Sequence, residues 1–370
     1  MDGPASGSGE WLDALVIGGG SAGLASAYHL QRRGLKFAVL EAARTTSGAW
    51  PEYYDSLRLF TPARHSGLPG LPFPGDPQRY PARDEVSAYL RAYAVYFAFP
   101  TVSGAEVISV RPVANGFEVR ARDGRVWRSR RVISASGTFR RPHWPHLPGM
   151  AAYGGRPLHS AEYRRPEAFA GQRVVVVGAG NSAAQIAAEL GHVATVTLAV
   201  RRPPRVVAQR PLGLDLTDWL TLSGIEKLPL GAFGRLPDVQ PVIAVPGIRA
   251  ALAAGRPDIR PMFSRFTPGG VVWQENKEEK VDSVIFATGY GWNGGYLPAA
   301  ALHSSGEPRQ RSGESTTLPG LYFVGLPGQR TVASGTLRAA GPDAEAVVQR
   351  LAAGLRQPSP EEHRRVHALS

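Results

Sequence analysis

The chain has 370 residues, of which 43% are hydrophobic and 19% charged, a composition typical of globular proteins with sizeable cores. The formal net charge is +12, but the arginines are scattered over the whole length and no run of five basic residues occurs. Because proteins that bind nucleic acid concentrate their positive charge, we expect no nucleic-acid partner.

The absence of cysteine excludes disulfides, thiolate nucleophiles and redox-active thiol pairs. Residues 1–10 lack the apolar core of a signal peptide, and no apolar stretch approaches the ~20 residues that a membrane span needs. We therefore predict a cytoplasmic protein without a membrane partner and with flexible termini at 1–10 and 357–370. No metal site is predicted.

The first third of the chain predicts a strand–helix–strand unit, then a long loop and a meander. Gly34 closes the first helix, and Asp84 is expected to cap the second. Residues 43–82 are dominated by proline, glycine and aromatic residues, as in ordered loops that line sites. The predicted elements are strands at 12–17 and 37–40, helices at 22–33 and 85–97, and meander strands near 106–111, 117–122 and 125–134.

The same strand–helix–strand architecture returns in the second half of the chain, again with a glycine-rich turn after the first strand. Residues 203–262 are rich in proline and resist assignment, but we expect them to contribute to the roof of an active site. The predicted elements are strands at 174–177, 195–200, 271–274, 281–287 and 321–324, and helices at 182–190 and 342–355.

The first glycine turn reads Gly18-x-Gly20-x-x-Gly23 and has the pattern of a dinucleotide-binding motif. The first glycine allows the tight turn, the second lets a pyrophosphate approach, and the third lets helix and strand pack closely. Amides at the helix N-terminus attract the diphosphate, and an acid ends the next strand. The alternative is a glycine-rich turn without a ligand. The expected cofactor contacts are Gly18, Gly20, Ser21, Ala22, Gly23 and Glu41.

The second glycine turn reads Gly178-x-Gly180-x-x-Ala183, with Asn181 and Ser182 inside it. No acid follows the next strand; Arg201 and Arg202 stand there instead. A guanidinium can clamp a ribose 2′-phosphate that a carboxylate would repel. The pair therefore favours NADPH over NADH, unless it is simply a solvated strand end.

Several further segments resemble one family, the flavin-containing monooxygenase and Baeyer–Villiger monooxygenase superfamily, and especially its short bacterial flavoproteins. The resemblance spans nearly the whole chain. It rests on the fingerprint-like Tyr153 and Gly155-x-x-x-His159-x-x-x-Tyr163, the run Gly178–Ala183, the outward crossing Ala135–Gly137, the return crossing Phe286–Tyr290, and the closing segments Leu321–Gly325 and Gln329–Thr331.

This resemblance implies an α/β fold with two Rossmann-like domains that bind FAD and NADPH. The FAD domain would span 11–150 and 286–356 and contain the antiparallel meander, with the NADPH domain inserted at 151–285. Besides the glycine turns, the implied cofactor contacts are Trp50, Val107, Thr288, Gly289, Gly325 and Gln329.

Four residues are implied in catalysis: His159, Trp50, Thr61 and Arg330. The histidine would shape cofactor movement and not act as a general base. The ring of Trp50 would lie near the flavin, with a core aromatic as the alternative. Arg330, and with it Arg338, could supply positive potential to the reduced flavin.

The activity implied is that NADPH reduces FAD and dioxygen then forms a C4a-(hydro)peroxyflavin, which oxygenates a small organic substrate. Three departures weaken this expectation: a single glycine in Ser47-Gly48-Ala49-Trp50, no asparagine in Leu59-Phe60-Thr61-Pro62, and no Trp-Pro after Tyr163. A flavoprotein that passes electrons from NADPH to a protein, free flavin or oxygen stays open. A non-catalytic nucleotide sensor also stays open. For the oligomeric state, a homodimer is a possible assembly.

Overall fold

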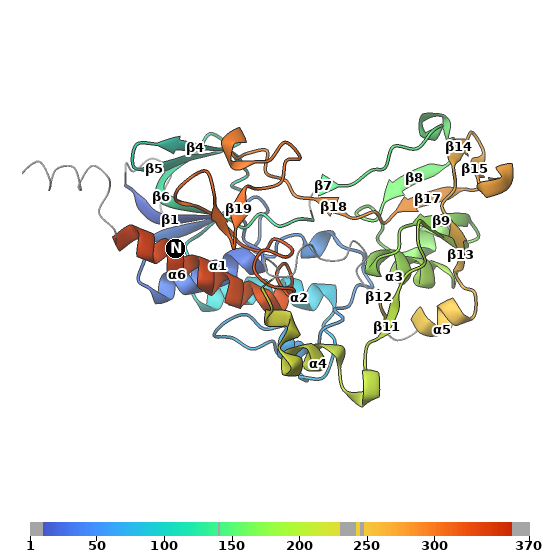
Figure 1. Ribbon diagram of the computed structural model, residues 1–370, viewed down its shortest axis with the longest axis horizontal. Coiled ribbons are helices and arrows are strands. Elements are labelled where there is room, and N and C mark those ends of the chain that lie inside the picture. The colour runs from blue at the N-terminus through green and yellow to red at the C-terminus, as the bar shows by residue number, and fades with distance from the viewer. Residues whose placement is uncertain (1–9, 140, 230–241, 245–247, 357–370) are drawn as a thin grey trace, which may run out of the picture.

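The computed structural model describes residues 10–139, 141–229, 242–244 and 248–356. Among these residues, two mainly parallel sheets form the centres of two lobes that lie side by side along the long axis (Figure 1). We call them the first lobe and the second lobe. The predicted flexible termini lie, apart from Glu10, outside the described residues.

The sheet of the first lobe contains parallel strands in the order β21-β6-β1-β2-β3. A short hairpin, β19–β20, extends it antiparallel to β21. The strands are β1 (Leu12–Ile17), β2 (Phe37–Glu41), β3 (Thr101–Ser103), β6 (Val126–Ser134), β19 (Gln310–Arg311), β20 (Glu314–Ser315) and β21 (Leu321–Phe323). The carboxyl ends of β1, β2, β6 and β21 therefore meet at one edge of the sheet, where ligands of such folds bind.

Helices cover one face of this sheet and the meander covers the other. Alternate residues of β1 point to opposite sides, so that Val16 packs among the helices and Leu15 packs beneath the meander. The helices are α1 (Ser21–Arg32), α2 (Arg83–Tyr96) and α6 (Ala340–Arg356), and Figure 1 shows α6 lying along α1. The meander consists of β4 (Val107–Val113), β5 (Gly116–Ala121) and β6, joined by antiparallel pairing.

The sheet of the second lobe is parallel throughout, in the order β13-β10-β9-β17-β8. Helix α3 (Asn181–Leu190) packs on one face and a small antiparallel sheet covers the other. The parallel strands are β8 (Arg156–His159), β9 (Arg173–Val177), β10 (Thr195–Val200), β13 (Asp258–Pro261) and β17 (Ser283–Phe286); the small sheet is β14 (Arg265–Thr267), β15 (Gly270–Val272) and β16 (Glu278–Lys280).

The two chain crossings between the lobes lie beside each other. β7 (Arg141–Pro142), on the way out, pairs antiparallel with β18 (Tyr290–Gly291), on the way back. The predicted fold class, two Rossmann-like domains with a meander, is thus confirmed. The exact boundaries 11–150, 151–285 and 286–356 remain a proposal.

Most predicted elements are present, with three differences. Asp84 does not cap α2: the N-cap is Ala82, whose amide donates to Glu85 (2.8 Å), while Asp84 lies in the first turn and binds Arg83. The third meander segment also pairs parallel with β1, because one strand serves both layers. The strand expected at 271–274 ends at Val272.

The unassigned region 203–262, outside its gaps, contains β11 (Val206–Ala208), α4 (Leu216–Ser223), β12 (Val242–Ala244), α5 (Ile248–Ala253) and the missed strand β13. Single turns of 3-10 helix are η1 (Trp50–Glu52), η2 (Ala63–His65), η3 (Met150–Ala152), η4 (Pro166–Phe169), η5 (Pro211–Gly213), η6 (Ile225–Lys227), η8 (Gln274–Asn276), η9 (Ala299–Ala301) and η10 (Leu337–Ala339). None of the described helices combines the length and apolar character that a membrane span requires.

Candidate cofactor site

The first and third glycines of the first turn are required by the fold itself. Gly18 has a φ of 108°, and a Cβ there would lie 2.4 Å from the carbonyl oxygen of Ala135. A Cβ at Gly23 would lie 1.8 Å from the carbonyl oxygen of Gly18. Both clashes involve backbone atoms that cannot move aside. A side chain at Gly18 would push the turn away from the segment that follows β6, and a side chain at Gly23 would push α1 away from β1.

The middle glycines of the two turns differ from these, because the fold itself does not require a glycine at either position. Gly20 and Gly180 have φ values of −81° and −90°, which any residue adopts. A Cβ at Gly20 would lie 3.5 Å from the Cα of Gly48, an ordinary contact, and a Cβ at Gly180 would meet nothing within 4 Å. Each turn thus keeps open the space that a diphosphate needs above the amides of a helix N-terminus. The residues present fit a dinucleotide in both lobes.

Glu41, at the end of β2, is buried and bound to the first turn. One carboxylate oxygen accepts from the amide of Gly19 and the other from the amide of Ala43, each at 2.7 Å. The acid therefore shapes the turn, and its contact with a ribose stays a proposal.

Four more predicted contacts lie around the first turn. Ser21 and Ala22 open α1, and a Cβ at Gly325 would come within 2.8 Å of the Cβ of Ala22. Val107 begins β4, two residues after Ala105, whose amide donates to the carbonyl of Glu41 at 2.8 Å. Residues far apart in the sequence thus meet at the edge where β1, β2 and β21 end.

In the second lobe the turn lies against the adjoining strands. Gly178 has a φ of 142°, its amide donates to Ala199 of β10 (3.1 Å), and a Cβ there would lie 2.4 Å from the carbonyl oxygen of Ala287. The side-chain oxygen of Asn181, the first residue of α3, accepts from the amide of Ile243 (2.8 Å) and so holds β12 beside the turn. Ser182 is exposed in the first turn of α3.

Arg201 and Arg202 follow β10 directly and are both exposed. Within the described part of the chain neither forms an ion pair. Their charges are available to an anion at the end of the strand next to the glycine turn, which is the placement that a ribose 2′-phosphate requires.

His159 is fully buried at the end of β8 and uses both ring nitrogens. Nδ1 accepts from the amide of Ala161 (3.1 Å), so Nε2 carries the hydrogen and donates to the carbonyl of Gly289, also at 3.1 Å. Burial lowers the pKa of the imidazole, which keeps the ring neutral. The histidine thus connects the second lobe to the returning crossing, and its indirect role in cofactor movement remains a prediction.

The crossing itself carries Thr288 and Gly289. The hydroxyl of Thr288 donates to the carbonyl of His143 on the outward segment, and the amide of His143 donates to the carbonyl of Gly289 (3.0 Å). These bonds fix the two segments to each other between the lobes.

Trp50 and Thr61 lie on the long loop of the first lobe and are both half-buried. The indole packs at the edge of the helix-side core and against Tyr53, with ring centroids 5.6 Å apart. The hydroxyl of Thr61 lies 3.1 Å from that of Ser66.

The loop after β21 does not offer free cations. Arg330 is paired with the buried carboxylate of Asp343 (3.0 Å), and Arg338 is paired with Glu226. The amide side chain of Gln329 is turned inward and donates to the carbonyl of Phe323 (2.7 Å). The expected positive potential is therefore reduced by the paired acids, because a neutralised pair has a weak field at a distance.

A row of aromatic rings that the sequence analysis did not single out connects the lobes. From Tyr53 the row continues through Phe139 (5.8 Å) and Tyr290 (5.5 Å further) to His159 (4.9 Å). Phe139 is 47% exposed. The one sequence signal for this row was the density of aromatic residues in the loop 43–82, and this density does not show which rings contact each other.

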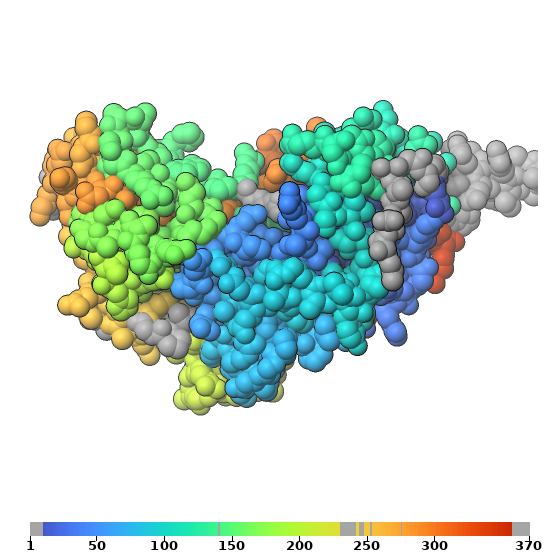
Figure 2. All heavy atoms as spheres, turned by 180° about the vertical axis from the view of Figure 1, so that it is seen from behind, coloured from blue at the N-terminus to red at the C-terminus, as the bar shows by residue number. Residues whose placement is uncertain are grey.

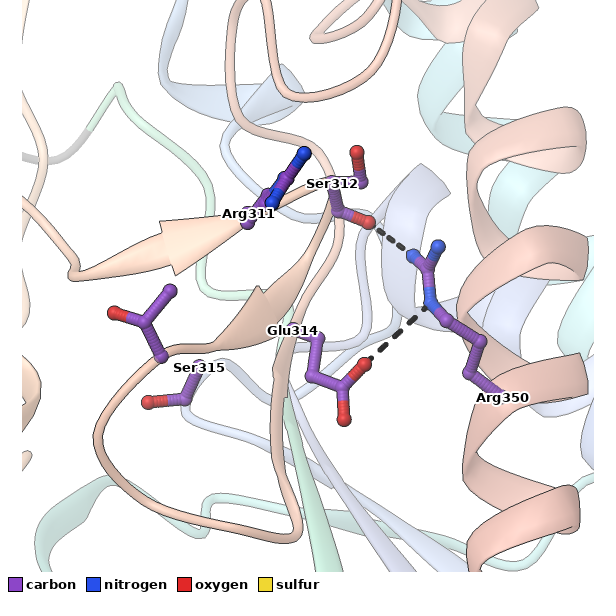
Figure 3. A pocket seen from close by; sticks show the side chains of 6 residues that line it. Arg311, Ser312, Glu314, Ser315 and Arg350 are labelled. Atoms are coloured by element: carbon purple, nitrogen blue, oxygen red, sulfur yellow. Dashed lines mark hydrogen bonds and ion pairs between the residues drawn. The ribbon is translucent and has the colours of Figure 1, made fainter.

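A separate hollow of about 310 Å³ lies between the β19–β20 hairpin and α6 (Figure 3). There Arg350 donates to the carbonyl of Ser312 and lies 3.8 Å from Glu314. It is lined by Arg311, Ser312, Glu314, Ser315, Thr316 and Arg350. None of the predicted site residues is among them, so this hollow is not the cofactor site.

Two glycine turns at the carboxyl edges of two parallel sheets define an oxidoreductase of the class that binds two dinucleotides. Comparisons agree with this class. The family model described as pyridine nucleotide-disulphide oxidoreductase matches residues 15–219. An "Uncharacterized oxidoreductase CzcO-like" of Geobacillus kaustophilus is 32% identical over 91% of this chain and 97% of its own length.

Two functionally named proteins are also similar. Indole-3-pyruvate monooxygenase YUCCA1 of Oryza sativa subsp. japonica is 31% identical over 85% of this chain and 86% of its own. The structure of a flavin-containing monooxygenase from Stenotrophomonas maltophilia superposes with a TM-score of 0.83 and 33% identity, covering 94% of this chain and 99% of that one. The chain belongs to the flavin-containing monooxygenase and Baeyer–Villiger monooxygenase superfamily. It is an enzyme that depends on FAD and NADPH.

Proposed function

We propose that the protein is an NADPH-oxidising monooxygenase that transfers one oxygen atom from dioxygen to a small organic substrate. The observation that carries the proposal is the open space at Gly20 and Gly180, one in each lobe, with the paired crossings between them. The relatives named as monooxygenases support it. The lack of cysteine argues against the thiol chemistry in the name of the matching family model.

Bound FAD would accept hydride from NADPH and activate dioxygen, one atom of which goes to the substrate and the other to water. The chain's own part is to bind and to position. The first turn, with Glu41, would hold FAD, and the second turn, with Arg201 and Arg202, would hold NADPH. His159 would fix the second lobe to the returning crossing through Gly289, and the aromatic row would support the two crossings between the lobes.

A second function is favoured by one observation. Both arginines of the loop after β21 are paired with acids, and the segment Leu59-Phe60-Thr61-Pro62 lacks the asparagine that amine-oxidising relatives carry before the Gly-Pro that faces the flavin. A site with weak charge stabilisation suits a flavoprotein that gives its electrons to oxygen without transferring oxygen to a substrate. A homodimer and a cytoplasmic location stay predictions from the sequence.

One experiment separates the two functions. NADPH consumption is measured with an amine, a sulfide, a ketone or an aromatic 2-oxo acid, together with the hydrogen peroxide and the oxygenated product formed. A monooxygenase yields about one product per NADPH with one of these substrates and little peroxide. Peroxide that equals NADPH with every substrate contradicts oxygen transfer, and free FAD without the protein serves as the background.

A further inference from the structure

A segment of the second lobe reaches across to the first lobe. We call residues 203–229 the strap. It begins just after Arg201 and Arg202, runs through β11, which pairs with β12, and continues as α4 and η6. Figure 1 shows α4 below the helices of the first lobe, away from the sheet from which the strap departs. In Figure 2 the yellow-green residues of the strap lie against the blue residues of the long loop.

Asp218 of α4 binds two basic side chains of the first lobe. Its carboxylate receives two hydrogen bonds from the guanidinium of Arg64, the Nε bond at 3.1 Å, and one from Nε2 of His65 at 2.7 Å. The side chain of Asp218 is 13% exposed. The hydrogen bond from Arg64 lowers the pKa of Asp218, so the carboxylate is ionised. Charge-assisted bidentate pairs of this kind fix geometry as well as adding energy.

The other two acids of the strap contact the first lobe as well. Asp215, the N-cap of α4, accepts from the hydroxyl of Tyr80 at 2.6 Å. Glu226 binds Arg338 through its side chain and accepts from the amide of Ala333 (3.4 Å) through its carbonyl. Two further contacts are the hydrogen bond from the side-chain amide of Gln209 to the carbonyl of Phe60 (3.3 Å) and the antiparallel β-bridge between Pro229 and Thr331.

Several apolar side chains of the strap are exposed, whereas others, such as Leu216 and Leu220, are half-buried. Leu212 is 94% exposed and Leu222 74% exposed, whereas the three acids face the first lobe. Ion pairs and hydrogen bonds thus contribute much of this contact, and such polar contacts separate more easily than a hydrophobic interface of the same size.

Most of the residues that these contacts reach lie in two segments of the first lobe. Arg64 and His65 belong to the turn that begins with Thr61, and Ala333 and Arg338 belong to the loop that begins with Gln329 and Arg330. Both segments were assigned to the flavin from the sequence. The strap therefore holds, from the second lobe, the two segments of the first lobe that are expected to face the isoalloxazine ring.

We propose that Asp218 is a positioning residue for hydride transfer: through Arg64 and His65 it holds the Thr61 segment in the place that the reaction needs while the strap is docked. Glu226 does the same for the loop 329–338. The strap starts at the expected phosphate clamp, so it joins the nicotinamide site to the walls of the flavin site. This inference rests on the assignment of FAD to the first lobe, but it does not depend on oxygen transfer.

The test uses the FAD-loaded protein and the variants Asp218→Asn and Asp218→Glu. The control is Asp123→Asn, which removes an aspartate paired with an arginine (Arg125, 2.6 Å) at the tip of the meander. Hydrogen–deuterium exchange is measured in peptides that cover 59–66 and 216–228. Anaerobic reduction of the flavin by NADPH is followed by its absorbance, without a substrate.

In Asp218→Asn we expect exchange in both peptides to rise about tenfold and the limiting reduction rate to fall roughly ten- to hundredfold. The NADPH concentration for half-maximal rate should stay within about twofold, because Arg201 and Arg202 are unchanged. Asp218→Glu should recover most of the rate, and Asp123→Asn should match the natural protein.

Two results would overturn the proposal. Unchanged exchange would show that Asp218 does not hold the Thr61 segment, and faster exchange with an unchanged reduction rate would show that its position does not matter. If Asp218→Asn does not fold with FAD, Arg64→Gln breaks the same contact from the other side and must give the same two effects. A protein that reduces FAD normally but never oxygenates a substrate refutes the proposed monooxygenase and leaves this test intact.

Discussion

The imidazole of His159 donates from Nε2 to the carbonyl of Gly289, 3.1 Å away and 130 positions further along the chain. The bond joins the end of β8 in the second lobe to the crossing that returns to the first. Both nitrogens of the ring are engaged and the ring is buried. The histidine therefore has no hydrogen bond left to offer a reacting group, which argues for a positioning role.

We predict that His159→Ala lowers the free energy of unfolding by about 2–4 kcal/mol, because the buried ring leaves a cavity, the amide of Ala161 loses its partner and the carbonyl of Gly289 keeps only the amide of His143. His159→Gln, which can still donate to Gly289, should lose less. Urea titration of both variants gives the comparison. The pH profile of NADPH oxidation should keep its shape in His159→Gln; a missing limb would mean that the imidazole transfers protons.

The same residue predicts a dependence of stability on pH. Burial lowers the pKa of His159 below its usual 6.5, so between the two values the unfolded chain binds a proton that the native protein does not. The contribution of the neutral ring is present above pH 6.5 and is lost as the pH falls below it. Unfolding titrations should show a smaller loss in His159→Gln than in the natural protein. Equal losses would contradict the shift, and His29, whose pKa is also lowered, is common to both proteins.

The glycines of the two turns predict opposite consequences for the same substitution. Gly23→Ala should destabilise the protein without any ligand, because its Cβ would lie 1.8 Å from a backbone oxygen. Gly180→Ala should leave the melting temperature of the ligand-free protein unchanged and weaken NADPH at least tenfold, about 1.4 kcal/mol. Gly20→Ala should do the same for FAD. Thermal unfolding and calorimetric titration separate the two effects, and full NADPH affinity in Gly180→Ala would remove the second site.

Much of this arrangement could be predicted from local patterns. The glycine spacing predicted both turns, because each glycine is required locally, either by the backbone or by the ligand. The apolar runs predicted β1 and β10 with their exact ends. The contact of Arg64 with Asp218 joins positions 154 apart, and neither residue stands in a local pattern. Likewise, the sequence suggested Arg330 as a free cation because it contains no signal that Asp343 is folded against it.

Arg201 and Arg202 predict the choice of nicotinamide. Both are exposed and have no acidic partner among the residues described, so their removal costs no internal contact. The double variant Arg201→Ala, Arg202→Ala should bind NADPH roughly ten- to hundredfold more weakly, as expected for the loss of bidentate phosphate contacts, and NADH almost unchanged. Kd values for both dinucleotides decide the point, because an equal loss for the two would refute the phosphate assignment.

The pairing of Arg330 with Asp343 yields a prediction on stability and pH. Burial already raises the pKa of Asp343 although Arg330 opposes the shift, so Arg330→Ala should raise it further. The carboxylate of Asp343 would then be buried without a cationic partner, which lowers the free energy of unfolding by roughly 3 kcal/mol at neutral pH. Since a raised pKa favours the protonated folded form, the deficit should shrink as the pH falls through the pKa of Asp343. Denaturant titrations from acid to neutral pH test this, and the double variant Arg330→Ala, Asp343→Asn should recover the loss at neutral pH. If the double variant is as unstable as Arg330→Ala and the deficit does not change with pH, the arginine acts on something other than this carboxylate, and its role toward the flavin is open again.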